Sequence, residues 1–137
     1  MLWTAVVVRD HGATICDMAD KDVLGRAGED RAAHYLESLG FAVLDRNWRT
    51  KEGELDLVVA SARELVVVEV KTRRTELFGH PFEAVHELKK VRLWRLAMAW
   101  IAAHHDLAQG RRLRIDAIGI IGPDPRTGAL EHLEGLM

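Results

Sequence analysis

A glutamate and a lysine stand within a run of valines in the segment LVVVEVK, from Leu65 to Lys71. The run is rich in β-branched residues and is typical of a strand buried in a sheet. A charged side chain that is buried without a partner costs several kcal/mol as an order of magnitude. Glu69 and Lys71 therefore need compensating groups close by, and those groups are the first candidates for a chemical site.

The segment ELDLVVA supplies a partner strand, because the few residues between the two segments leave room only for a tight turn. With the turn centred between residues 62 and 63, Asp56 lies opposite Glu69 and Glu54 lies opposite Lys71. Opposed residues of an antiparallel pair share one face. Val58, Ala60, Leu65 and Val67 complete this charged face, and the other face is wholly apolar, with Leu55, Leu57, Val59, Val66, Val68 and Val70.

Two opposed carboxylates, at about 5 Å between backbone positions, repel each other unless a proton or a cation lies between them. Mg²⁺ suits such a pair, because it binds through one or two carboxylates and keeps most of its waters. The pattern predicts a metal site at Asp56 and Glu69, with Lys71 in the same cavity. The alternative is a structural ion pair of Lys71 with Glu69 or Glu54, worth only ~0.2–1 kcal/mol.

A third carboxylate, Glu29, lies in a segment with helical spacing and shares the face of Ala32 and Leu36. Asp30, Arg31 and Glu37 look outward from the same helix. An acid on a core-facing stripe indicates a functional role. Its position in the first two turns offers a second explanation, because acids there favour the helix dipole.

Basic residues gather between positions 71 and 95. The seven basic residues outnumber the three acidic ones by four, although the formal net charge of the whole chain is −2. Such a patch can bind phosphate groups, and it is also typical of an ordinary solvated surface. The basic residues are Lys71, Arg73, Arg74, Lys89, Lys90, Arg92 and Arg95, and the acidic ones are Glu76, Glu83 and Glu87.

The periodicity predicts an α/β domain of order αβββαβ, with helices covering a mixed sheet. The first helix begins at Asp22 as N-cap and ends at Gly40, and a long helix covers 81–105. We expect Leu88, Val91, Arg95, Met98 and Ala102 to form one stripe of that long helix, and its second half to be buried against the sheet. Strands are expected at FAVLDRNW, ELDLVVA, LVVVEVKT and LRIDAIGI, with a short final strand near 130–133.

The composition fits one globular domain, because 48% of the 137 residues are hydrophobic and 29% are charged. Residues 1–20 show no sustained period and form a poorly defined N-terminal extension, and translation starting at Met18 is an alternative. The apolar runs are too short for a membrane span. The single cysteine, Cys16, and the lack of zinc-ligand spacing agree with a reducing compartment, so we expect a cytoplasmic protein.

An ordered set of segments resembles the YraN-like family of uncharacterised bacterial proteins, from about Val23 to Leu133. That family resembles the PD-(D/E)xK nucleases and, among them, the archaeal Holliday-junction resolvases. The segments are GRAGEDRAAHYLESLGF, RNWR, GELDLVV, VVVEVKTR, KKVRLWRLAMAWI and RIDAIGI.

The resemblance implies a restriction-endonuclease-like core over residues 21–137, in which Asp56 and Glu69 hold Mg²⁺ or Mn²⁺. Lys71 matches the motif lysine and Glu29 the helical acid, whereas Leu55 replaces the proline of the motif name. The implied activity is metal-dependent phosphodiester hydrolysis, with DNA, branched or damaged, favoured over RNA as the substrate. A homodimer is implied because two cuts need two sites, and a non-catalytic module that binds nucleic acid or protein is the alternative.

The remaining expectations concern binding and support. We expect the basic residues beyond the motif to hold flanking phosphates without reading bases, namely Arg73, Arg74, Lys89, Lys90 and Arg92. Trp48 and Arg49 are expected to clamp the edge of the site, or Trp48 to belong to the core. Asp116, inside an apolar strand, is expected to accept hydrogen bonds from a loop or an arginine.

Overall fold

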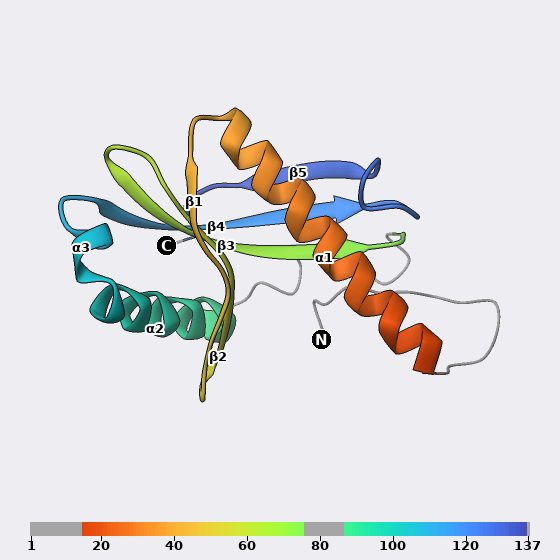
Figure 1. The fold of residues 1–137 in the computed structure, drawn as a ribbon, viewed down its shortest axis with the longest axis horizontal. Coiled ribbons are helices and arrows are strands. Elements are labelled where there is room, and N and C mark those ends of the chain that lie inside the picture. Colours follow the sequence, from red (N-terminus) through yellow and green to blue (C-terminus); the bar gives the residue numbers. More distant parts are fainter. Residues whose placement is uncertain (1–14, 76–86, 137) are drawn as a thin grey trace.

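A computed structural model of the chain describes residues 15–75 and 87–136 and confirms a mixed sheet flanked by helices (Figure 1). The predicted order is found, with a short additional helix before the fourth strand and the expected final strand at the end. The elements are α1 (Ile15–Ser38), β1 (Ala42–Thr50), β2 (Gly53–Ala60), β3 (Glu64–Arg73), α2 (Glu87–Ala103), α3 (His105–Ala108), β4 (Arg112–Ile121) and β5 (Ala129–Leu133).

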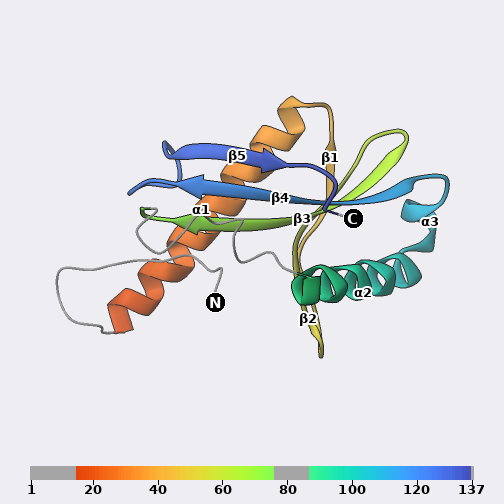
Figure 2. The same ribbon diagram turned by 180° about the vertical axis from the view of Figure 1, so that it is seen from behind.

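The five strands lie in the order β1-β2-β3-β4-β5, with β3 and β4 parallel and the other neighbours antiparallel. Two clusters of buried side chains pack on opposite faces of this sheet. Helix α1 covers the face of Leu57, Val59 and Val66, and α2 covers the other face with Leu93 and Trp100. Figure 2 shows the same layers from behind. No helix in the described ranges has both the length and the apolar character to span a bilayer.

The β2–β3 hairpin has the predicted register over four pairs, from Ala60↔Leu65 to Leu57↔Val68. The ladder ends there, and β2 curves away together with β1 while β3 continues beside β4 (Figure 1). We refer to this point as the fork. The strict alternation expected for β2 fails at the fork, because Leu55 packs in the α2 cluster rather than on the apolar face assigned to it.

Helix α1 begins at Ile15, before the predicted Asp22, and ends as predicted in a turn at Gly40. Gly40 has φ 99°, its N–H donates to the Glu37 carbonyl, and the Phe41 N–H donates to the Leu36 carbonyl. These bonds form a Schellman motif, in which glycine adopts the left-handed conformation without strain. The turn directs the chain back along the sheet into β1.

The stripe predicted for α2 is not its buried face, whereas the expected burial of the second half of the helix is found at Leu96, Ala97 and Trp100. The expected stripe is exposed, with Leu88 at 76% and Met98 at 45% relative exposure. The buried residues are Leu93, Leu96, Ala97 and Trp100. Both stripes are apolar, and the buried one includes Trp100, whose indole N–H donates to the Asp45 carboxylate at 2.8 Å. The predicted first turns, 81–86, lie outside the described residues.

Candidate active site

Asp56 and Glu69 lie at the fork, and both are buried, at 7% and 4% relative exposure. The Asp56 carboxylate replaces the ladder that ends there, because the Val70 N–H donates to its Oδ2 at 2.8 Å. A buried backbone N–H needs an acceptor, and where the ladder ends the Asp56 side chain supplies it. The same bond fixes the Asp56 carboxyl group beside Glu69, so the local backbone geometry positions the acidic pair.

The pKa values of the two acids are shifted in opposite directions. Burial, then the negative charge of Glu69, raises the pKa of Asp56 well above its ordinary value. Burial would also raise the pKa of Glu69, but Lys71 and Lys89 outweigh it and hold that pKa below the ordinary value. The contact between the two side chains acts in the same sense, because it raises the pKa of Asp56 and lowers the pKa of Glu69. A proton on Asp56 or a cation between the two carboxylates would each reduce their repulsion.

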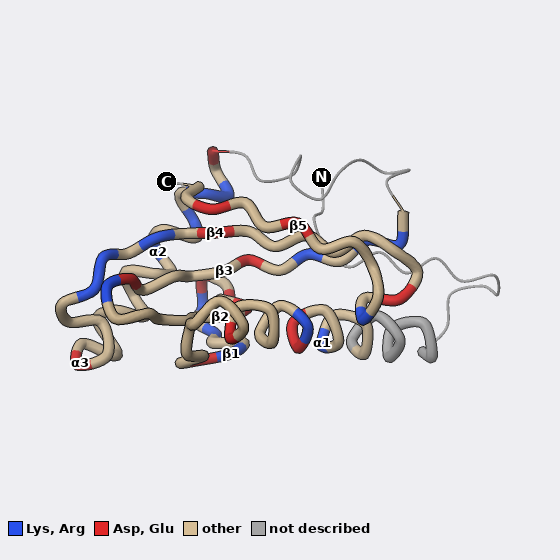
Figure 3. The backbone as a smooth tube through the Cα atoms, turned by 90° about the horizontal axis from the view of Figure 1, so that it is seen from above, with Lys and Arg blue, Asp and Glu red and all other residues tan. Residues whose placement is uncertain are grey.

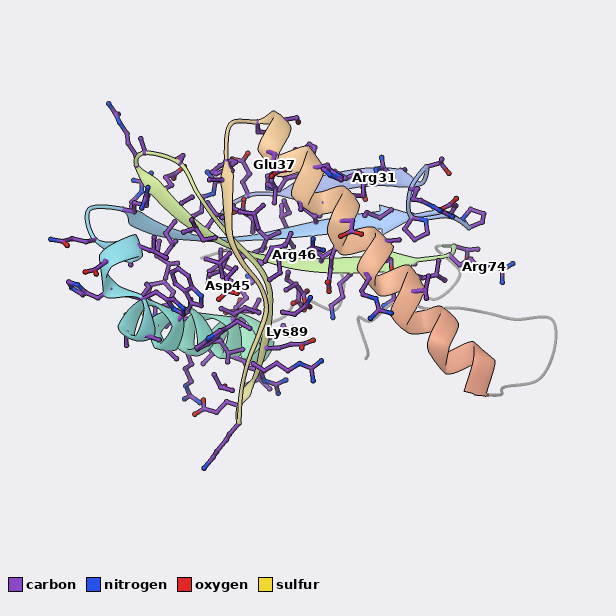
Figure 4. All side chains as sticks on the ribbon, viewed as in Figure 1. Arg31, Glu37, Asp45, Arg46, Arg74 and Lys89 are labelled. Atoms are coloured by element: carbon purple, nitrogen blue, oxygen red, sulfur yellow. The ribbon has the colours of Figure 1, made fainter. Side chains whose placement is uncertain are left out.

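Two ammonium groups complete the centre. The Lys71 Nζ lies 3.2 Å from Glu69 Oε2, and the Lys89 Nζ lies 2.9 Å from the same oxygen. Lys71 reaches Glu69 along β3, whereas Lys89 comes from the first turn of α2, beside the β1–β2 hairpin (Figure 4). We name Asp56, Glu69, Lys71 and Lys89 the fork cluster.

Glu29 approaches from α1, which covers the other face of the sheet from α2. Its pKa is raised by burial and lowered in part by a hydrogen bond with Asn47. Its Oε1 is buried and has no hydrogen-bond partner among the described residues. Asn47 has the left-handed φ of 51° in β1, and its side chain is the group that bonds to Glu29. The structure therefore places Glu29 beside β1, with Asn47 as its hydrogen-bond partner.

The basic residues expected to hold phosphates do not form one surface. Lys89 turns inward to Glu69, and Arg73 is only 2% exposed. Lys90 pairs with Glu87 at 3.3 Å on α2, while Arg92 is exposed on the same helix. Arg74 lies at the outer end of β3, far from Lys89 (Figure 4). Figure 3 shows basic and acidic residues interspersed along the strands.

The site-edge residues also separate. Arg49 pairs with Glu54 at 2.8 Å, so Glu54 does not need Lys71 as its partner. Trp48 packs against the core cluster under α2, and its ring lies edge-on to His104 with 6.2 Å between centroids. The core alternative for Trp48 is therefore confirmed.

Asp116 accepts hydrogen bonds from an arginine and from a loop, as predicted. Arg114 donates to both its oxygens, at 2.9 and 2.8 Å, and the Gly135 N–H donates at 3.0 Å. The unforeseen member is His132, which lies 2.7 Å from Asp116 and 2.9 Å from the Tyr35 hydroxyl. These bonds lower the pKa of Asp116 against the effect of burial. The network attaches α1 and the C-terminal residues to β4.

The fork cluster has the donor chemistry for a hard divalent cation, because carboxylate oxygens are the ligands that Mg²⁺ and Mn²⁺ prefer. Within residues 15–75 and 87–136, no group of three or more Asp, Glu, His or Cys side chains gathers as a ligand set. The residues present therefore fit a sparse site of two carboxylates, completed by water.

The fold and this centre define an α/β protein with a buried acid–lysine cluster at a fork in its sheet. The chain belongs to the uncharacterised protein family UPF0102, whose family model matches residues 28–120. It is 47% identical to a UPF0102 protein of Arthrobacter sp. (strain FB24) over 119 residues, which are 87% of this chain and 99% of the relative. A UPF0102 protein of Leifsonia xyli is 42% identical over 120 residues, 88% of this chain and 100% of its own length. The expected YraN-like membership is thereby confirmed.

Proposed function

We propose that this protein is a metal-dependent hydrolase of DNA phosphodiester bonds on a restriction-endonuclease-like core. The observation that carries the proposal is the fork cluster, in which Asp56, Glu69 and Lys71 converge at the buried end of a hairpin. A protein that only bound nucleic acid would gain nothing from two acids that must face phosphate. The substrate we favour is branched or damaged DNA.

Asp56 and Glu69 would hold Mg²⁺ or Mn²⁺, which, when bound, supplies a water nucleophilic at neutral pH and stabilises charge on the phosphate. Glu29 stays a predicted site residue with a buried, unpartnered Oε1, but among the described residues it forms no three-acid ligand set with Asp56 and Glu69, so we assign the metal to those two. The Val70 N–H keeps Asp56 in place. Lys71, which is 11% exposed in its side chain, would orient the attacking water or neutralise a phosphoryl oxygen.

The second candidate is a binding module that keeps this fold without catalysis. Lys89 favours it, because its ammonium already lies at 2.9 Å from Glu69 and compensates the carboxylate internally. In that case the fork cluster is an ion-pair network that stabilises the fold.

Cleavage assays separate the two candidates. The wild type is incubated with linear, nicked, flapped and four-way DNA in Mg²⁺, Mn²⁺ or chelator, beside Asp56→Asn and Lys71→Met. We expect cleavage of one DNA geometry, dependent on metal and lost in both variants. Failure to cleave any of these substrates in either metal would favour the binding module.

A further inference from the structure

A groove runs between α2 and the turn that joins β1 to β2. Its walls are the turn residues Thr50, Lys51 and Glu52 and the α2 residues Trp94, Arg95, Leu96, Met98 and Ala99. The turn approaches the helix closely, because a Cβ at Gly53 would lie 3.3 Å from a Leu96 methyl group. The groove is therefore a built feature of the fold, formed on the side of α2 that carries Met98 and Arg95 of the stripe predicted from the sequence.

Apolar surface is exposed along this groove. Trp94 is 41% exposed and Met98 45%, and Leu88 and Val91 extend the same apolar stripe towards the first turn of α2. A half-exposed tryptophan presents a flat ring on which a planar group can stack. Exposed aromatic surface of this kind indicates a binding site more often than an isolated exposed leucine does.

The charges beside the ring select an anionic partner. Lys51 and Arg95 are exposed and contribute to the groove, and Arg92 is exposed one turn earlier on α2. Glu52 is the acid among the groove residues. A second copy of the chain is a poor occupant of the groove. If two copies paired through this face about a two-fold axis near its middle, Arg95 of one copy would face Arg95 of the other, and the like charges would repel.

We propose that this groove binds an unpaired nucleic-acid strand, with a base stacked on Trp94 and phosphates held by Lys51 and Arg95. Unpaired strands are bound by aromatic platforms combined with a positively charged groove, and every base offers a face for stacking. The proposal deepens the proposed function and rests on it for its biological setting. It makes the protein selective for DNA with a single-stranded portion, such as a flap or a damaged site.

The groove lies on a different side of α2 from the fork cluster. Lys89 of the fork cluster and Trp94 lie five residues apart on α2, which is about 7.5 Å along the helix axis. Lys89 turns inward to Glu69, while Trp94 turns outward to the groove. A strand seated on Trp94 would therefore have to pass round the first turns of α2 to reach the acids.

The test measures binding in chelator, so that cleavage plays no part. Fluorescence anisotropy compares a labelled 15-mer of dT, the same length of rU and a blunt duplex. We expect both single strands to bind more tightly than the duplex. Trp94→Ala should weaken single-strand binding by about 5- to 150-fold, the effect of losing one stacked base, and Trp94→Phe should restore most of it.

Two further variants complete the design. Arg95→Gln should reduce the slope of log affinity against log salt by about 0.7 for a single strand. The matched control is Leu107→Ala on α3, which removes an equally exposed apolar side chain (40%) outside the groove and should bind as the wild type does. Thermal melts exclude misfolding as the cause of any loss.

Equal single-strand affinity of the wild type and Trp94→Ala would overturn the proposal. A second result would also overturn it: the wild type sediments as a dimer, Trp94→Ala sediments as a monomer, and added oligonucleotide does not dissociate the wild-type dimer. The groove would then be an interface between two copies of the chain. The proposed function fails independently: Trp94-dependent binding without metal-dependent cleavage would leave the groove standing and remove the hydrolase.

Discussion

Asp56→Asn should make the metal-free protein more stable while it abolishes metal-dependent cleavage. The raised pKa of Asp56 means that ionisation of this carboxyl group opposes folding. The folded state binds its proton more strongly than the unfolded state, so this contribution to stability falls as pH rises from the ordinary value through the folded one. At neutral pH the substitution removes that penalty.

The size of the effect follows from the contacts. Two carboxylates at about 4 Å repel by roughly 4 kcal/mol at an effective dielectric constant of about 20. Lys71 and Lys89 offset part of this repulsion through Glu69. The new amide still accepts the Val70 N–H and can donate to Glu69. We therefore expect the free energy of unfolding to rise by about 1–2 kcal/mol, which raises Tm by roughly 3–8 °C in a domain of this size.

Thermal melts in chelator and in Mg²⁺ measure the effect. The wild type should gain stability from the metal through binding to the folded state, and Asp56→Asn should gain much less. Glu54→Gln is the matched control, because it removes one carboxylate from the same strand but only an exposed ion pair with Arg49, worth about 0–1 kcal/mol. If Asp56→Asn melts far below the wild type in chelator, and the wild type ignores both metals, the cluster is a structural ion-pair network and the hydrolase proposal is wrong.

Four further outcomes are expected. Mg²⁺ affinity, measured by calorimetry, should rise with pH through the raised pKa of Asp56, because the metal must displace its proton; an affinity independent of pH would contradict this. Gly28→Ala should cost about 1–3 kcal/mol by chemical denaturation, since its Cβ would lie 2.3 Å from a Thr72 methyl, whereas Gly25→Ala, with nothing within 4 Å, should gain up to about 1 kcal/mol. Asp116→Ala should lower the free energy of unfolding by about 3–5 kcal/mol. Because the pKa of Asp116 is lowered in the fold, the stability that its ionised carboxylate contributes to the wild type should be lost as pH falls through that lowered pKa. Lys90→Glu should keep the fold and flatten the salt dependence of duplex binding by about 0.9 per lost phosphate contact, whereas Lys89→Glu should also lower Tm, because it adds a carboxylate beside Glu69.

The hairpin could be predicted because residues 54–60 and 65–71 of its two strands are apolar except at four positions. Any one-residue slip would have mixed acids with valines, so the parity of Asp56 and Glu69 was well determined. The end of the ladder could not be predicted. It depends on the Asp56 side chain accepting the Val70 N–H in place of a backbone carbonyl, and side-chain capture of a backbone group leaves no periodic signal.

The α2 error has a different cause. Two sets of apolar residues in α2 repeat with helical spacing. One set is Leu88, Val91 and Met98, and the other is Leu93, Leu96 and Trp100. Periodicity alone could therefore not choose between the two apolar stripes. The choice depends on tertiary partners, in particular the Asp45 carboxylate that accepts the Trp100 N–H. The exposed stripe is then available for the groove that contains Trp94.

Lys89 shows what the correct stripe would have revealed. It precedes Leu93, Leu96 and Trp100 at spacings of four, seven and eleven residues, so it belongs to the buried face of α2. A cation on a core-facing stripe needs an acid, by the same reasoning that marked Glu69 within its run of valines. The sequence therefore contained two core-facing charges that each needed a partner, Lys89 and Glu69, which lie 2.9 Å apart in the structure. Their pairing was not predicted because the buried stripe of α2 was not identified. Because this lysine competes with any metal for Glu69, Lys89→Met should tighten Mg²⁺ binding if the carboxylates form a metal site, and should only destabilise the fold if they do not.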